Sequence, residues 1–116
     1  DEVRSVENNA STSGYRKLLG LTGKYSGTEI PIGPNQKIIL GRDASAASLV
    51  VNGEKISRVH CSIQFSEGAQ NNYIITDHSS NGVFVDGKRI PRDLLICVSE
   101  GSIIALADGA NKFQRE

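Results

Sequence analysis

The stretch Val59-His60-Cys61-Ser62-Ile63-Gln64-Phe65 alternates apolar and polar side chains without interruption. Successive side chains of a strand point to opposite faces of its sheet, so this alternation predicts a strand with one apolar and one polar face. A helix would instead need apolar residues three and four positions apart. Residues 59–65 therefore decide the fold in favour of β structure.

Short apolar stretches recur on both sides of this strand, roughly every eight to twelve residues, between clusters of Gly, Asn and Asp. This rhythm is typical of an all-β sandwich or barrel. Asp86-Gly87 lies between two short β-prone segments and favours a two-residue hairpin turn. We predict strands at residues 15–21, 28–32, 37–41, 48–51, 59–65, 73–77, 83–85, 88–90 and 102–107, with a further one at 112–114.

The chain has 116 residues, which is the size of a single domain. Residues 1–14 contain few apolar side chains among Ser, Asn, Glu and Gly, and we predict that they form a flexible leader or an interdomain linker. Residues 15–116 carry the strand rhythm and are predicted to form the folded domain.

The charges of the chain balance, with 13 Lys and Arg residues against 13 Asp and Glu residues. A surface that binds nucleic acid or anionic lipid usually carries a basic excess, so neither partner is expected. The longest apolar runs, such as Ile103 to Ala107, are far shorter than the roughly twenty residues that span a bilayer. Any anion that this chain recognises must therefore be bound by a local arrangement of charges.

The two cysteines, Cys61 and Cys97, form no CxxC motif and have no paired histidine spacing, so the sequence predicts no zinc site and no disulfide framework. We interpret them as reduced, buried cysteines of an intracellular protein, while a single disulfide between them is also compatible with the sequence. The chain has no glycine-rich nucleotide-binding loop. Neither a metal nor a cofactor is expected.

Four short motifs follow one another between the predicted strands. They are Gly-Arg at 41–42, Ser-Arg-Val-His at 57–60, Asp-His-Ser-Ser-Asn-Gly at 77–82 and Asp-Gly at 86–87. Each motif is common alone, but in this order and within an all-β pattern the set resembles the forkhead-associated (FHA) domain, which binds phosphothreonine peptides. The resemblance implies a β-sandwich of two twisted, mainly antiparallel sheets with about ten or eleven short strands.

The resemblance also implies which residues bind the phosphopeptide. A phosphothreonine presents about two negative charges and three acceptor oxygens, and an arginine can donate two parallel hydrogen bonds to it. By resemblance, Arg42 and the Ser57 hydroxyl contact the phosphate, and Arg58 reaches the phosphate or the peptide backbone. Ser80 adds a contact through its amide or hydroxyl, and the Asn81 amide binds the peptide main chain.

Three further residues are expected to support the site, namely Gly41, His60 and Gly82. His60 also forms, with Ser57 and Asp77, the residue types of a hydrolase triad. The sequence has no nucleophile elbow, however, and the resemblance implies that the histidine is structural. A small Ser/His hydrolase is therefore only a remote alternative.

The remaining polar residues near these motifs receive simpler interpretations. His78 is expected to be an exposed turn residue with at most a minor part in peptide contact. Lys55, Lys88 and Arg89 are expected to be solvated loop charges, although each of them is able to add positive field near the site.

The resemblance implies a non-enzymatic, phosphothreonine-dependent binding module of a larger signalling protein, whose other domains are free to include a kinase or another catalytic domain. The expected partner is a phosphothreonine-containing protein, and the isolated domain is expected to be a monomer. We expect an intracellular protein, in the nucleus rather than the cytoplasm, and by association one of the cell cycle or the DNA-damage response. The alternative is a phosphate-independent scaffold or dimerisation domain of the same fold.

Overall fold

The computed structural model describes residues 16–66 and 72–116, and these residues form strands and loops without a helix. The predicted leader at residues 1–14 lies outside the described residues. No helix long and apolar enough to cross a membrane occurs in the parts that are described. The strands are β1 (Arg16–Thr22), β2 (Glu29–Ile32), β3 (Lys37–Gly41), β4 (Leu49–Val50), β5 (Cys61–Ser66), β6 (Asn72–Asp77), β7 (Val83–Val85), β8 (Lys88–Arg89), β9 (Ile96–Cys97), β10 (Ile103–Leu106) and β11 (Asn111–Arg115).

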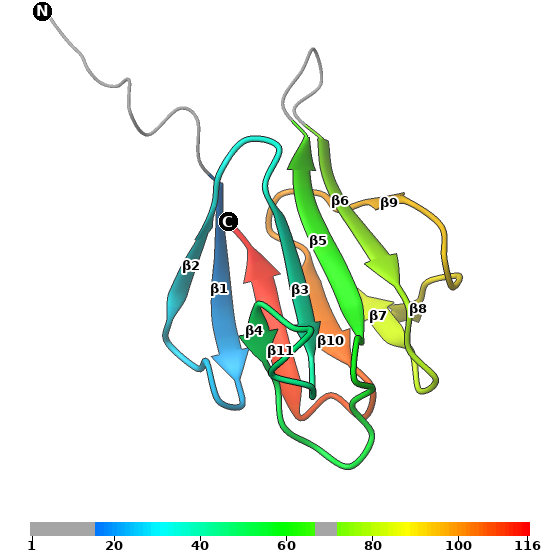
Figure 1. Ribbon diagram of the computed structural model, residues 1–116. Coiled ribbons are helices and arrows are strands. Elements are labelled where there is room, and N and C mark those ends of the chain that lie inside the picture. Colours follow the sequence, from blue (N-terminus) through cyan, green and yellow to red (C-terminus); the bar gives the residue numbers. More distant parts are fainter. Residues whose placement is uncertain (1–15, 67–71) are drawn as a thin grey trace, which may run out of the picture.

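The strands form two sheets that face each other, so the predicted all-β sandwich is confirmed (Figure 1). One sheet has the order β2-β1-β11-β10-β7-β8, and the other has the order β4-β3-β5-β6-β9. Every pairing between strands of the described chain is antiparallel except that of β3 with β4.

The core lies between the two sheets and is built from alternate residues of the strands. Removing these apolar side chains from water is the main stabilising contribution, at about 1.5 to 3 kcal/mol for each large one. The largest apolar side chains that are fully buried are Tyr73, Phe65, Phe113, Leu18, Ile32, Leu40, Ile63, Ile75, Ile104, Leu106 and Val51.

Strand β5 has the predicted alternation, and part of its polar face is buried as well. Cys61, Ile63 and Phe65 are buried on the core side. On the other side, His60 just before the strand and Ser62 within it are also buried, at 0% and 5% exposure. The predicted apolar and polar faces are confirmed, and Gln64 on the polar face is partly exposed.

The predicted strands agree with the observed ones to within about two residues at each end, which is the usual uncertainty of strand limits. The Asp86-Gly87 turn is confirmed: Val85 pairs with Lys88, and the two turn residues have φ angles of 51° and 84°. Strand β9 was not predicted. It has only two residues and lies at the edge of the five-stranded sheet, where it pairs with β6.

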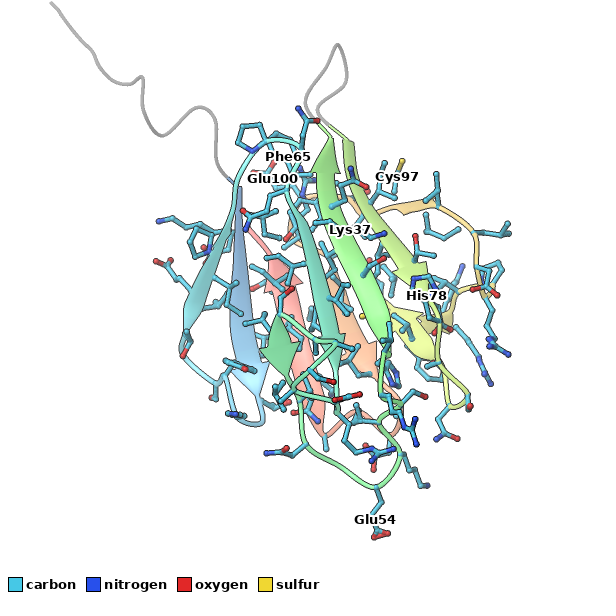
Figure 2. All side chains as sticks on the ribbon, in the orientation of Figure 1. Lys37, Glu54, Phe65, His78, Cys97 and Glu100 are labelled. Carbon is cyan, nitrogen blue, oxygen red and sulfur yellow. The ribbon has the colours of Figure 1, made fainter. Side chains whose placement is uncertain are left out.

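The two cysteines are both free, as expected, but the prediction that both are buried is wrong. Cys61 is buried in β5, and burial raises the pKa of its thiol. Cys97 is exposed because it belongs to the edge strand β9, and Figure 2 shows its side chain directed away from the sandwich.

The two ends of the sandwich differ: one holds the start of β1 and the end of β11, and the other holds the loops that contain the sequence motifs. The start of β1 and the end of β11 lie together at one end, where the Glu116 amide donates to the Lys17 carbonyl oxygen at 3.0 Å (Figure 1). Strands β3 and β6 end, and β5 begins, at the opposite end. The motifs singled out in the sequence follow β3, precede β5 and follow β6, so the fold collects them at that opposite end.

Candidate functional site

Three loops meet at this end of the sandwich. They are the β3–β4 loop (42–48), the β4–β5 loop (51–60) and the β6–β7 loop (78–82), and Glu54 marks the tip of the second one in Figure 2. Arg42 N donates to Ser57 O at 2.9 Å, which joins the first loop to the second. His78 N donates to His60 O at 2.9 Å, which joins the second loop to the third. The three loops therefore form one continuous surface.

Gly41 permits the closest of these approaches. A Cβ atom at this position would lie 1.9 Å from the Arg58 carbonyl oxygen and 2.7 Å from its carbonyl carbon, which is far inside van der Waals contact. The obstacle is backbone and cannot rotate away. Glycine is therefore required here so that the β3–β4 and β4–β5 loops can touch.

The Arg42 side chain is exposed, and one hydrogen bond from its Nε fixes it. Its Nε donates to the Ile56 carbonyl oxygen at 3.0 Å, and its terminal Nη nitrogens have no partner among residues 16–66 and 72–116. Arg58 is exposed in the neighbouring loop. Hydrogen bonds from Ser45 lower the pKa of the Asp43 carboxyl, and the charges of Arg58 and Arg42 lower it further. Both guanidinium groups thus act on the same small region of the surface.

The buried His60 side chain connects the β4–β5 loop to the β6–β7 loop. Its Nδ1 accepts a hydrogen bond from Ser57 N at 3.1 Å, so its Nε2 carries the proton and donates to Gly82 O at 2.9 Å. Burial lowers the pKa of His60, although the Gly82 bond and the Asp77 charge partly offset this effect. The ring is therefore neutral and uses both of its nitrogens to hold backbone.

This arrangement is incompatible with a hydrolase triad of Ser57, His60 and Asp77. The His60 nitrogens bond two backbone groups rather than the serine hydroxyl and the carboxylate. The Ser57 Oγ accepts a hydrogen bond from Ser80 N at 3.2 Å, and Asp77 Oδ1 binds Ser79. The remote hydrolase alternative is wrong, because the general base has no free nitrogen with which to activate the hydroxyl.

A chain of hydrogen bonds shapes the β6–β7 loop. Asp77 Oδ1 accepts from Ser79 N at 2.7 Å and from Ser79 Oγ at 2.6 Å, and this hydroxyl accepts from Gly82 N at 2.8 Å. Asp77 and Ser79 are both fully buried. Residues 77–82 are a cluster of short side chains, which readily bond nearby backbone amides and favour tight turns, and the structure shows which of them form these bonds.

Asn81 lies at the exposed tip of this turn and reaches across to the second loop. Its Nδ2 donates to the Lys55 carbonyl oxygen at 2.9 Å, which fixes the orientation of the amide. The Oδ1 atom has no partner among the described residues, so the amide can still accept a hydrogen bond. Gly82 follows with a φ of +96°, a conformation that favours glycine. Ser80, beside Asn81, is also exposed.

His78 departs from its expected role. Its side chain is 35% exposed rather than solvated, and it bridges Ser62 Oγ and Asp93 Oδ1, each at 3.3 Å. The His78 side chain points away from the three loops and lies against Ser62 on the outer face of the five-stranded sheet (Figure 2). The structure thus brings together Arg42, Ser57, Arg58, Ser80 and Asn81, with Gly41, His60 and Gly82 in support, and leaves His78 to one side.

The sandwich and its three joined loops define a β-sandwich module with an exposed, donor-rich end. The family model described as the FHA domain matches residues 38–107, which is more than half of the chain. The chain belongs to the FHA domain family.

Individual relatives agree with this assignment. The chain is 29% identical over 86 residues to the meiosis-specific serine/threonine-protein kinase MEK1 of Saccharomyces cerevisiae, a match that covers 72% of this chain and 17% of that protein. The chain thus spans about a sixth of the length of that relative.

Solved structures show the same fold. The MEK1 FHA domain matches with a TM-score of 0.79 and 23% identity, covering 90% of each chain. The FHA domain of CT664 from Chlamydia trachomatis matches with a TM-score of 0.73 and 29% identity, covering 87% of this chain and 95% of that one. The MEK1 domain has also been solved with a phosphothreonine peptide of HOP1, with a TM-score of 0.71, 24% identity and coverage of 86% and 93%.

Proposed function

We propose that this domain is a non-enzymatic module that binds phosphothreonine-containing proteins through the three joined loops. The main observation behind this proposal is that Arg42, Ser57 and Asn81 lie together on one exposed surface of an FHA domain, although they come from three separate sequence motifs. The MEK1 relative, whose FHA domain binds a phosphothreonine peptide of HOP1, supports the same chemistry.

Arg42 and Ser57 are the proposed phosphate ligands. The Arg42 Nε–H is used by Ile56, which leaves the terminal nitrogens to donate to phosphate oxygens. The Ser57 Oγ accepts from Ser80 N, so its own proton is available for a phosphate oxygen. Because His60 holds Ser57 N and Ile56 holds the arginine, both donors are fixed before the ligand arrives, which reduces the entropy lost on binding.

Arg58, Ser80 and Asn81 are proposed to bind the rest of the ligand. Arg58 is exposed beside Ser57 and adds positive charge near the phosphate. Asn81 keeps a free acceptor and its second amide proton, which suit the N–H and C=O groups of an extended peptide. Ser80, with its hydroxyl exposed, flanks both ligands. The peptide is therefore read through its phosphate and its main chain together.

We also infer the setting of the domain. The kinase relative supports placing it in a longer signalling protein. We propose a nuclear rather than cytoplasmic location for that protein. Roles in the cell cycle or in the DNA-damage response, and a monomeric state of the isolated domain, remain predictions. Balanced charge argues against nucleic acid or membrane as the partner.

The proposal is tested with a library of fluorescent phosphothreonine peptides, each paired with its unphosphorylated form, in a polarisation assay. Arg42→Ala should weaken binding by about 10- to 200-fold, since one charged hydrogen bond contributes about 1.5 to 3 kcal/mol. Lys37→Ala is the matched control, because Lys37 is an exposed cation at the start of β3, the strand that Arg42 follows. Binding that survives phosphatase treatment would instead support the alternative of a phosphate-independent scaffold.

A further inference from the structure

Arg89 lies beside the proposed site although it belongs to none of the three loops. It is the second residue of β8, at the edge of the six-stranded sheet, and pairs with Phe84 of β7. Its side chain is exposed, as expected for a solvated charge. The side chain is nevertheless held in place by contacts with Gly82 and Ser80.

The Arg89 side chain occupies the space that a side chain at position 82 would fill, and we call this contact the Gly82 seat. A Cβ atom at position 82 would lie 2.7 Å from Arg89 Nε and 3.1 Å from its Cζ, so the guanidinium rests directly on the glycine backbone. Its Nη2 also donates to Ser80 O at 3.4 Å, which is a long and weak hydrogen bond. Arg89 is thereby held against the turn that contains Asn81, and its other guanidinium donors have no partner among residues 16–66 and 72–116.

The seat places this charge next to the proposed phosphate ligands. Ser80 contacts Arg89 through its carbonyl oxygen and Ser57 Oγ through its amide, so a single residue separates the guanidinium from the serine hydroxyl. The ion pairs found within residues 16–66 and 72–116 are Lys17–Glu29 and His78–Asp93, and neither compensates Arg89. A fixed guanidinium that has no carboxylate partner within the described part of the chain is suited to a carboxylate that comes from a ligand.

We propose that Arg89 is a specificity-determining residue that selects an acidic side chain near the phosphothreonine of the bound peptide. This inference rests on the proposed function. The Gly82 seat fixes the direction of the guanidinium, and the carboxylate of an Asp or Glu accepts two parallel hydrogen bonds from it. A purely structural Arg89 would support the Asn81 turn for every peptide alike, so preference among peptides separates the two roles.

The test uses phosphothreonine peptides that carry Asp or Lys at one flanking position and alanine at the others. Their affinities are measured for the wild type, Arg89→Glu and Lys88→Glu. Lys88 is the matched control, because it is the exposed neighbour of Arg89 in β8 and adjacent side chains of a strand point to opposite faces. Arg89→Gln is included in case the reversed charge disturbs folding, which circular dichroism would reveal.

We expect the wild type to bind the Asp peptide about two- to fivefold more tightly than the Lys peptide at one or two flanking positions, the range of exposed ion pairs. Arg89→Glu should invert this preference, Arg89→Gln should abolish it, and Lys88→Glu should retain it. The preference should also fade at about 1 M salt, where the Debye length is near 3 Å.

Two results would overturn the inference and leave the proposed function intact. One is an equal loss of affinity for all phosphopeptides in the Arg89 variants, which would mean that Arg89 only supports the turn. The other is an Asp preference that the Arg89 variants retain. If the wild type binds phosphorylated and unphosphorylated peptides equally, the proposed function itself fails, and the inference fails with it.

Discussion

Replacing His60 by alanine should destabilise the domain and loosen its site at the same time. The ring is fully buried and holds Ser57 N through Nδ1 and Gly82 O through Nε2. His60→Ala removes both partners and leaves a donor in the β4–β5 loop and an acceptor in the β6–β7 loop without their hydrogen bonds. It also leaves a cavity where the ring was.

The magnitude follows from these two contacts. Leaving a buried polar group without its hydrogen bond costs about 1 to 3 kcal/mol, so the two groups together should lower the free energy of unfolding by about 2 to 6 kcal/mol. A water molecule that enters the cavity would move the result toward the lower end of this range. A domain of this size has about 5 to 15 kcal/mol in total, so His60→Ala should lose a large part of its stability.

The assay is urea unfolding followed by circular dichroism, with His78→Ala as the matched control. His78 is the other histidine of the chain, is partly exposed, and makes two longer contacts of 3.3 Å, so its loss should cost less than about 1 kcal/mol. Equal destabilisation by the two variants would refute the reasoning, because it would show that the buried contacts of His60 add nothing.

Three further predictions follow from the same loops. Gly41→Ala should lower the free energy of unfolding by more than 2 kcal/mol, roughly the upper range for a point mutant, because its Cβ collides with Arg58 O; thermal unfolding checks this, and a variant as stable as the wild type would contradict it. Asp43→Asn should tighten phosphopeptide binding about two- to fivefold, since the amide retains an oxygen for Ser45 but removes the negative charge near Arg58; polarisation titration checks this, and unchanged affinity would contradict it. The free energy of unfolding should be highest above pH about 6.5 and fall as the pH drops below that value, because the unfolded chain then binds a proton that buried His60 resists. In urea titrations this fall should be smaller in His60→Gln than in the wild type, and an equal fall in both would assign it to other groups.

Much of the fold was predictable because it is encoded locally. The alternation in residues 59–65 and the Asp86-Gly87 turn depend on a strand's two faces and on backbone conformation, and both were confirmed. Strand β9 was not predictable in the same way. Its two residues follow the exposed Leu94 and Leu95 without any alternation, and they become a strand only because they pair with β6.

The sequence indicated which candidate residues lie in the loops at this end of the sandwich, but not how these residues contact one another. The motifs identified Arg42, Ser57 and Asn81, whose placement in loops follows from the strand limits. The sequence contains no sign that Arg89 rests on Gly82, because these residues meet only through the pairing of β7 with β8 and the turn before it. Contacts of this kind depend on tertiary structure, and a motif does not contain them.

The same limit explains the errors about individual side chains. Cys97 was expected to be buried because cysteine usually is, but an edge strand exposes it. Asp77 has the residue type of a triad acid, yet its carboxylate serves the β6–β7 turn through Ser79. Residue type and order define what a side chain is able to do, and its neighbours in the fold decide what it does.

The most direct test of the central claim is the affinity of the wild type and of Arg42→Ala for one phosphothreonine peptide selected from the library, beside the same peptide without phosphate. We predict that the wild type binds only the phosphorylated form and that Arg42→Ala loses about 10- to 200-fold in affinity. Equal affinity of the wild type for the two forms, or of the two proteins for the phosphorylated form, would contradict the account.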